Sequence, residues 1–428
     1  MKLKATAAAL ICALAAPVAH ADLVIPWLGY RTGPFSPGGI PTGDGFHDYM
    51  TLLNERDGGI GGVRVQVIDC ETAYNTQKGV ECYESTKGQG SLVYQPLSTG
   101  ITYQLIPKGT AEGIPILSSG YGRTAAANGR YFPWVFNFPA HYWDGASIAI
   151  KHILDLNGGD IAGKKVTLVH LNAAYGREPI PTLEELAKIH GFEVDFVPID
   201  FASSQEQKSQ WLDIRRKKPD YILMWGWGIM NAVAVQEAAN IRFPLENFIG
   251  IWWSGSENDV LPAGERAHGY KALALHRPGT DAPIFDDLQK HVFDKGLASG
   301  TGEHSGTVLY NRGAYGAMLT AEAIKTAQEI HGVADITPAM MRDGLENLVI
   351  TEEKMAANGF PNFGPPFAVS CENHGGDGKA WIQQWDAHAK EWKLVSDLIQ
   401  SDKELINRLV LEDAEKYAAE NNIEPREC

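Results

Sequence analysis

Apolar positions along the chain recur with two periods, one typical of strands and one typical of helices. Residues 23–28 form a short apolar run, and residues 63–67 alternate between valine and polar side chains, so both segments are predicted to be strands. Between positions 46 and 53 the apolar residues recur at i, i+3, i+4 and i+7, which predicts a helix. Residues 30–45 are rich in glycine, proline, serine and threonine and are expected to form a loop.

The alternation of strand and helix patterns continues through most of the chain. Further strands are predicted at 92–94, 114–117, 165–170, 192–197, 221–225 and 248–252, and further helices at 76–87, 144–156, 205–217, 230–241 and 308–331. Thr182 and Glu185 form a capping-box pattern, which is predicted to begin a helix that ends at Gly191. Repeated strand–helix units predict parallel sheets covered by helices on both faces, with ligands bound beyond the carboxyl ends of the strands.

The C-terminal part of the chain has a different pattern. Residues 367–369, 380–385 and 393–395 are predicted to be β segments joined by polar turns, and 402–420 to be an amphipathic terminal helix.

The first 21 residues have the pattern of a secretory signal peptide. Lys2 and Lys4 give a positive start, residues 5–16 are mostly apolar, and Ala19-His20-Ala21 matches a cleavage site. Cleavage leaves 428 − 21 = 407 residues, and no later segment offers 18 uncharged apolar positions in a row. The mature chain is therefore expected to be soluble and exported, in a bacterial periplasm.

Charge and length narrow the classes of partner and architecture. The chain carries 52 acidic and 37 basic side chains, a formal net charge of −15 that becomes 35 − 52 = −17 without the two signal-peptide lysines. Such acidity argues against nucleic acids and anionic membrane surfaces as partners. The length exceeds what one hydrophobic core usually serves, so two lobes are expected.

Four cysteines remain in the predicted mature chain: Cys70, Cys82, Cys371 and Cys428. An even number in an oxidising compartment predicts two disulfides, with three possible pairings. We favour Cys70 with Cys82, which closes a short loop after a strand, and Cys371 with Cys428, which ties down the C-terminus. A metal site is not expected, because no C-x-x-C and no histidine at ligand spacing occurs.

Catalytic signatures are mostly absent from the sequence. It has no G-x-S-x-G elbow, no H-E-x-x-H, no Walker loop and no complete dinucleotide fingerprint. We therefore expect no enzymatic activity and no cofactor. A secreted hydrolase is the alternative that the missing nucleophile and base argue against.

The loops that follow the predicted strands combine glycine with hydroxyl or aromatic side chains. Glycine lets backbone N–H groups approach a ligand, and aromatic walls supply apolar contact area. Arg31 and Arg123 are candidates for a counter-charge to an acidic ligand. The alternative is that the aromatic side chains only pack in the core. The candidate ligand-binding residues are Ser98, Thr99, Ser119, Gly120, Tyr121, Tyr175, Trp225, Trp227, Trp252, Trp253, Arg31 and Arg123.

Several short motifs in order give the chain a family resemblance. They are Leu28-Gly29, Thr32-Gly33-Pro34, Asn54, Gly58-Gly59-Ile60-Gly61-Gly62 and Tyr175-Gly176. Together they resemble the type I periplasmic solute-binding proteins of ABC importers, in the branch similar to Leu/Ile/Val-binding receptors. The resemblance implies two doubly wound parallel-sheet lobes joined by three crossovers, which close on a ligand like a Venus flytrap. The expected boundaries are 22–141 and 271–360 for lobe one, 142–270 and 361–398 for lobe two, and 399–428 for a C-terminal helical tail.

The resemblance also assigns roles, with one departure. It implies that hydroxyl and backbone groups at positions 98, 99 and 119–121 grip a ligand carboxylate, and that Tyr175 is the tyrosine of the second-lobe loop. Amino-acid receptors of this branch place a carboxylate after the strand found here at 248–251, to pair with the ligand ammonium. Here Trp252 and Trp253 occupy that place. Because an unpaired buried ammonium is costly, a flat ligand such as an aromatic carboxylate or an amide is favoured over an aliphatic amino acid.

The expected function is thus a non-catalytic, monomeric receptor. It captures a small organic ligand, carboxylate- or amide-bearing and aromatic or amino-acid-like, and delivers it to an inner-membrane ABC permease. A ligand-sensing subunit on the same fold, which signals to a partner, is the alternative.

Overall fold

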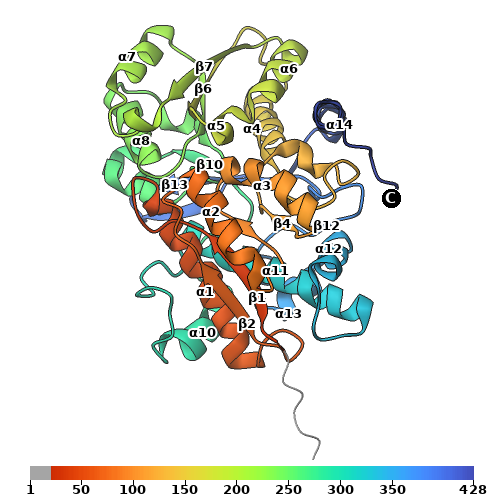
Figure 1. Cartoon of the computed structure of the whole chain (residues 1–428). Coiled ribbons are helices and arrows are strands. Elements are labelled where there is room, and N and C mark those ends of the chain that lie inside the picture. Colours follow the sequence, from red (N-terminus) through yellow and green to blue (C-terminus); the bar gives the residue numbers. More distant parts are fainter. Residues whose placement is uncertain (1–20) are drawn as a thin grey trace, which may run out of the picture.

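The chain folds into two α/β lobes, which lie one above the other in Figure 1. The computed structural model describes residues 21–428, so the predicted signal peptide lies outside the described residues except for Ala21. Each lobe is built on its own sheet, and parallel pairing dominates in both. The predicted α/β architecture is therefore confirmed.

The first lobe, at the bottom of Figure 1, has a short parallel sheet in the order β2-β1-β3. A second parallel pair, β4–β5, adjoins it through a bridge between Tyr94 and Ile116. The strands are β1 (Leu23–Leu28), β2 (Val65–Asp69), β3 (Gln95–Pro96), β4 (Ile116–Leu117) and β5 (Val135–Phe136). The helices are α1 (Ser36–Asp57), α2 (Thr76–Thr86), α3 (Thr99–Glu112), α10 (Ile284–Leu288), α11 (Val308–His331), α12 (Pro338–Glu346) and α13 (Glu352–Ala357), and a small hairpin pairs β11 (Val349–Ile350) with β12 (Phe367–Ala368).

Helix α1 begins much earlier than the sequence pattern predicts. The expected loop over residues 30–45 is wrong from Ser36 onward, where the helix starts with Pro37 in its first turn. Gly45 here serves close packing between helices instead of a turn. A Cβ atom on Gly45 would lie 2.0 Å from the Tyr310 carbonyl oxygen of α11, and one on Gly313 would lie 2.0 Å from the Thr42 carbonyl oxygen of α1. Only glycine allows the two long helices to approach this closely.

The second lobe has an eight-stranded sheet in the order β14-β13-β10-β9-β8-β6-β7, with β15 paired to β13. Its parallel part comprises β6 (Lys165–Leu171), β7 (Glu193–Ile199), β8 (Tyr221–Trp225), β9 (Phe248–Gly250) and β10 (Lys271–Ala274). The antiparallel strands are the predicted C-terminal segments, β13 (Lys379–Asp386), β14 (Glu391–Leu394) and β15 (Ile399–Gln400). The helices are α4 (Tyr142–Leu156), α5 (Ala174–Arg177), α6 (Ile180–His190), α7 (Lys208–Lys217), α8 (Ile229–Asn240) and α9 (Glu257–Val260).

Two local predictions for the second lobe need correction. Helix α6 begins at Ile180, with Pro181 in its first turn, so Thr182 lies inside the helix and is not its cap. Proline favours the first helical turn because it lacks the N–H that would be unpaired there. Strand β10 pairs with β9, so the chain returns to the first lobe after Ala274 and not at the expected boundary at 270/271.

Three passages connect the lobes. They run from β5 to α4, from β10 to α10 and from β12 to β13. The first and third lie side by side, since the backbone N–H of Asn137 donates to the His374 carbonyl over 3.1 Å and that of Gly378 to the Pro139 carbonyl over 3.2 Å. This arrangement is a hinge of adjacent segments.

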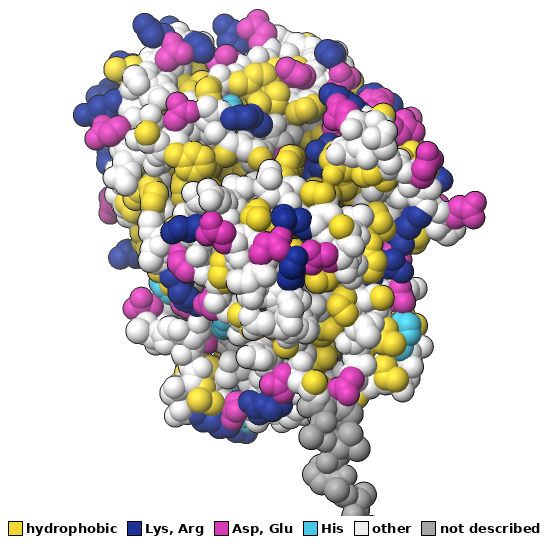
Figure 2. Space-filling model, viewed as in Figure 1, with side chains coloured by type: hydrophobic (Ala, Val, Ile, Leu, Met, Phe, Trp, Pro, Cys, Tyr) yellow, Lys and Arg dark blue, Asp and Glu magenta, His cyan; other side chains and the backbone are white. Residues whose placement is uncertain are grey.

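The C-terminal tail forms a further link between the lobes. Helix α14 (Lys403–Asn421), dark blue at the right of Figure 1, begins beside α4 of the second lobe. Farther along, Asp413 pairs with Arg123 of the first lobe at 2.5 Å. The chain then ends at the disulfide between Cys371 and Cys428, and Cys70 pairs with Cys82, so both favoured pairings are confirmed. Acidic and basic side chains are interspersed on the face shown in Figure 2. Within residues 21–428, no helix has the length and apolar content that crossing a membrane requires.

Candidate functional site

Loops from both lobes meet around a hollow of about 260 Å³, which we call the aromatic chamber. Seven of its ten lining side chains are tyrosine or tryptophan, and two of the others are hydroxyl-bearing. Aromatic walls with a few polar groups are typical of small-molecule sites. The lining residues are Tyr30, Tyr74, Leu97, Ser98, Thr99, Tyr121, Tyr142, Tyr175, Trp227 and Trp253.

A second hollow of about 440 Å³ adjoins the aromatic chamber, because Leu97, Tyr121 and Trp253 line both. Its walls come mainly from β1, α1 and α11 of the first lobe, and we call it the arginine chamber. The lining residues are Trp27, Thr42, Phe46, Gln95, Leu97, Ser119, Tyr121, Pro139, Trp253, Leu275, Arg312, Gly313, Tyr315, Gly316 and Leu319.

Direct hydrogen bonds cross from lobe to lobe around the chambers. The indole N–H groups of Trp252 and Trp253 both donate to the Gly120 carbonyl oxygen, over 2.7 and 2.9 Å. The indole N–H of Trp227 donates to the Tyr30 hydroxyl over 2.5 Å. The described conformation is therefore one in which the lobes are closed on each other.

The polar side of the aromatic chamber lies at the start of α3. Ser98 caps this helix, and its hydroxyl accepts from the Ile101 backbone N–H at 3.4 Å. The hydroxyls of Thr99 and Tyr142 lie 3.4 Å apart. A helix N-terminus with adjacent hydroxyls favours an anionic or carbonyl group of a ligand.

The tyrosines keep their protons. Burial raises the pKa of the Tyr30, Tyr142 and Tyr175 hydroxyls well above the usual value. Tyr175 donates to the Gly226 carbonyl oxygen over 2.9 Å, which fixes its ring at the chamber wall. The chamber thus presents neutral hydroxyls and aromatic faces.

Arg312 is the charged side chain of the arginine chamber. It lies in the middle of the first lobe on α11 and is only 4% exposed. Its Nη1 donates to the Trp252 carbonyl oxygen over 3.4 Å, and its guanidinium lies 5.0 Å from the centre of the Trp253 ring. Among the described residues its Nε and Nη2 have no hydrogen-bond partner. Burial lowers the pKa of Arg312 to about 9, so it is charged at neutral pH.

Acidic side chains are not part of either chamber wall as the described residues form them. The nearest candidate in sequence, Glu257, accepts from the Val308 backbone N–H at 3.0 Å instead, and burial raises its pKa to about 7. After strand β9, Trp253 lines both chambers, whereas Trp252 lines neither. The described residues 21–428 also hold no cluster of three or more potential metal-ligating side chains.

The structure brings together about half of the candidate residues. Ser98, Thr99, Tyr121, Tyr175, Trp227 and Trp253 line the aromatic chamber, and Ser119 lines the arginine chamber with its hydroxyl unpartnered. Gly120 and Trp252 line neither chamber, and the Trp252 indole N–H donates a hydrogen bond to the Gly120 carbonyl oxygen. Trp225 lies within strand β8 and lines neither chamber, so core packing describes it better.

The two arginines that the sequence suggests lie elsewhere. Arg31 pairs with Asp44 at 2.7 Å and with Asp69 at 3.2 Å. Arg123 pairs with Asp413 on the C-terminal helix. Neither lines a chamber, because carboxylates within the chain already bind both guanidiniums.

Sequence reasoning missed three tyrosines and Arg312. Tyr30 and Tyr74 follow β1 and β2, where the strand-end rule applies but the pattern of hydroxyl and glycine is weak. Tyr142 begins α4. The signal for Arg312 is a charge on the apolar face of a long helix, three residues after Leu309 and seven before Leu319.

Two parallel-sheet lobes with a chamber between their strand-end loops define a two-lobed ligand-binding fold. The sequence model described as "Periplasmic binding protein" matches residues 22–390, and the chain belongs to this family. No curated protein matches the chain.

Solved structures agree with this family. A protein described as an ABC transporter permease from the Pseudomonas fluorescens group is 35% identical, with 95% of this chain and 99% of that chain covered and a TM-score of 0.87. A branched-chain amino acid ABC transporter protein from Thermus thermophilus with bound valine is 20% identical, covering 92% and 99% with a TM-score of 0.76. A solute-binding protein from R. palustris in complex with benzoate is 15% identical, covering 89% and 98% with a TM-score of 0.68. The type I periplasmic binding fold that the resemblance implied is thus confirmed.

Proposed function

We propose that the chain is the periplasmic receptor of an ABC importer. It closes around a compact, flat organic ligand, without catalysing a reaction, and delivers the ligand to an inner-membrane permease. The aromatic chamber carries this proposal, since its seven aromatic side chains come from both lobes and enclose a ligand only when the lobes close.

The chemistry of the walls favours an aromatic ligand over an amino acid. Neither chamber has an acidic lining side chain among the described residues, so an ammonium group would be buried without a counter-charge. Among the similar structures, the R. palustris protein holds benzoate and the Thermus thermophilus protein holds valine. Because the chamber walls of the described chain lack an acidic side chain, benzoate is a better guide to the ligand class than valine.

A stability screen tests the proposal. The mature protein, freed of co-purified ligand by unfolding and refolding, is heated with aromatic carboxylates, aromatic amides, leucine and valine. A ligand at about 100 times its dissociation constant adds about 2.7 kcal/mol to stability. We expect aromatic compounds to raise the melting temperature and leucine and valine to leave it unchanged; the reverse result would remove the aromatic ligand class.

A matched pair of tryptophans locates the binding site. Trp253 lines both chambers, whereas Trp225 lies within β8 and lines neither. Trp253→Phe is expected to weaken the ligand found in the screen at least tenfold, and Trp225→Phe to leave its affinity within twofold. Delivery is tested separately, by uptake of that ligand in cells with and without the gene.

A further inference from the structure

Arg312 differs from every other arginine that the structure describes. The others either face solvent or lie within 4 Å of a carboxylate oxygen, as Arg31, Arg56, Arg123, Arg216, Arg342, Arg408 and Arg426 do. Arg312 is buried and has no carboxylate at that distance among residues 21–428.

A buried guanidinium in this position is unfavourable unless an anion joins it. Removing such an ion from water costs several kcal/mol, and arginine does not give up its proton at neutral pH. The Trp253 ring and the long hydrogen bond to Trp252 offset part of this cost. Two of the three guanidinium nitrogens still have no partner in the described chain.

Two hydroxyls of the same chamber are also buried and have no hydrogen-bond partner within residues 21–428. They are Ser119 Oγ and Tyr315 Oη. Two more polar side chains of the wall are already engaged: Thr42 donates to the Gly38 carbonyl, and the Gln95 amide donates to the Thr320 hydroxyl. A guanidinium fork with two free hydroxyls matches a planar anion that accepts several hydrogen bonds.

We propose that Arg312 binds the carboxylate of a planar organic acid whose ring lies against Trp253 and Tyr121. This inference rests on the proposed function and specifies its ligand class. The two rings line both chambers, so one compact ligand can contact the aromatic walls and reach Arg312. The carboxylate then lies deeper in the first lobe than the start of α3, where the family resemblance places it.

The position of Arg312 also connects binding to closure. The arginine belongs to the first lobe, whereas its two contacts, the Trp252 carbonyl and the Trp253 ring, belong to the second. These contacts take the guanidinium out of water when the lobes close. A carboxylate that neutralises it therefore favours the closed over the open form.

The test measures binding of acids against their amides by titration calorimetry with the mature protein. The probes are benzoate, 4-hydroxybenzoate and nicotinate, each paired with its primary amide. The variants are Arg312→Met, Arg312→Lys and, as a matched control, Arg277→Met. Arg277 lies in the second passage between the lobes but is exposed and lines neither chamber.

We expect at least one acid to bind the wild type more tightly than its amide. Arg312→Met should weaken that acid about 100-fold or more, Arg312→Lys about tenfold, and Arg277→Met less than twofold. Without ligand, Arg312→Met should melt at or above the wild-type temperature, because it removes an unpaired buried charge. If Arg312→Met does not fold, the proposal is judged from the acid affinity of Arg312→Lys and from the ratio of acid to amide affinity in the wild type.

Three outcomes would overturn the inference. Acid affinity that survives Arg312→Met removes the residue from the site. If the wild-type protein binds amides but none of the acids, the proposed receptor function stands and the proposed anion site at Arg312 is excluded. Protein that binds neither set loses both proposals for this ligand class.

Discussion

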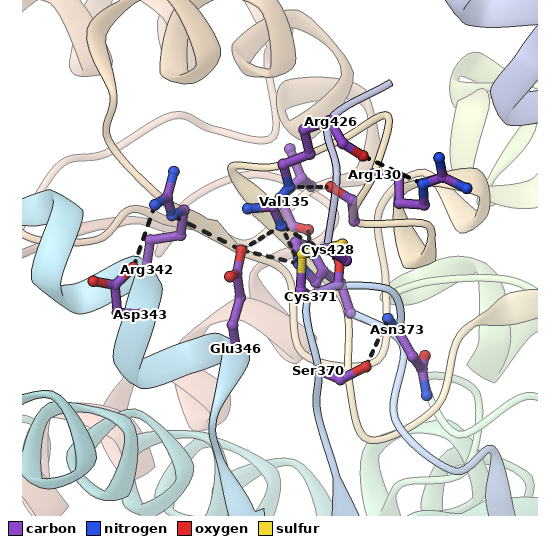
Figure 3. A network of polar contacts seen from close by, with 12 residues as sticks. Arg130, Val135, Arg342, Asp343, Glu346, Ser370, Cys371, Asn373, Arg426 and Cys428 are labelled. Carbon is purple, nitrogen blue, oxygen red and sulfur yellow. Dashed lines mark hydrogen bonds and ion pairs between the residues drawn. A yellow bond between two sulfur atoms is a disulfide. The ribbon is translucent and has the colours of Figure 1, made fainter. Parts of the chain in front are cut away.

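Two regions of the molecule hold arginines that are partly or fully buried, and they differ in whether the chain supplies a carboxylate for the guanidinium. The first is the C-terminal strap, which we define as residues 426–428 with the groups that hold them: Glu346, His374 and the disulfide partner Cys371. Figure 3 labels Arg426, Glu346, Cys371 and Cys428 of this region. There, Arg426 pairs with Glu346, and the His374 ring nitrogen lies 3.5 Å from the same carboxylate. The second region is the arginine chamber, where Arg312 has no such anion in the described chain.

The difference separates charges that hold the fold together from a charge kept for another molecule. In the strap, the Glu346 carboxylate lies beside both Arg426 and His374, so Arg426 has a counter-charge within the chain without a ligand. His276, which is buried near Arg312, needs no counter-charge, because burial and the nearby guanidinium hold its pKa well below the usual value and the ring stays neutral. At neutral pH an imidazole can lose its proton, whereas a guanidinium keeps its charge.

The largest expected effect comes from cutting the covalent link of the strap. The bond between Cys371 and Cys428 closes a loop of 57 residues, so replacing both cysteines with serine should lower the free energy of unfolding by about 4 kcal/mol in the chain-entropy model. The same change at Cys70 and Cys82, whose separation is 12, should cost about 3 kcal/mol. Urea unfolding measures both. An unchanged urea midpoint in the variant without the Cys371–Cys428 disulfide would mean that the strap contributes little to the stability of the fold.

Most of the fold follows from patterns that local sequence controls. Helix α11 has the predicted bounds, and strands β6 and β8 lie where apolar runs predicted them. The error at α1 has a long-range cause, because Gly45 meets the Tyr310 carbonyl oxygen of α11, 265 positions away along the chain. Sequence patterns within a window cannot distinguish a glycine that turns the chain from one that admits a neighbour.

The candidate site was predictable only in part for a similar reason. The strand-end rule located Ser98, Tyr121 and Trp253, since topology alone brings such loops together. It also selected Trp225, whose position at the end of β8 is correct but whose side chain packs in the core. Arg312 escaped because it lies on a helix, and its lack of a partner is a property of the packed structure and not of its neighbours in sequence.

The next largest effect is expected at a second buried histidine that, like His276, has a lowered pKa. Burial lowers the pKa of His152 to about 4, and its Nε2 has no partner within the described residues. The folded pKa lies below the ordinary value of about 6.5, so the neutral form contributes stability above that pH and this contribution is lost as the pH falls toward 4.

His152→Phe should therefore reduce the pH dependence of stability. Between pH 7 and 4 the wild type should lose about 3 kcal/mol more than the variant, as measured by urea unfolding at each pH. Lys271 and Asp155, which also act on this histidine, remain in both proteins. Parallel pH profiles for the two proteins would show that the imidazole is not kept neutral.

Removing the anion of the strap should have a smaller effect. Glu346→Gln keeps the shape of the side chain but leaves Arg426 without its carboxylate, at a cost of about 2 kcal/mol, less than for a fully buried pair because Arg426 is 24% exposed. Asp343→Asn is the control, since the Asp343 carboxylate is 34% exposed whereas that of Glu346 is 11% exposed, and a cost below about 0.5 kcal/mol is expected. Together with an unchanged or higher stability of Arg312→Met, this result would confirm the contrast. A stable Glu346→Gln and an unstable Arg312→Met would reverse it.

The smallest effect concerns Arg123, which resembles Arg312 in its surroundings. Both guanidiniums lie over aromatic rings, Arg123 at 4.6 Å from the centre of the Tyr417 ring and Arg312 at 5.0 Å from that of Trp253. Of the two, only Arg123 has a carboxylate partner in the part of the chain that the structure describes, and this partner, Asp413, is 34% exposed. Asp413→Asn should therefore lower the free energy of unfolding by about 1 kcal/mol or less, because water can solvate the freed guanidinium and the ring contact stays. It should leave ligand affinity unchanged. If added aromatic acids restored the stability of Asp413→Asn, a ligand carboxylate could replace that of Asp413. An unpaired arginine over an aromatic ring would then be enough to bind such an acid, and the chamber around Arg312 would not be needed.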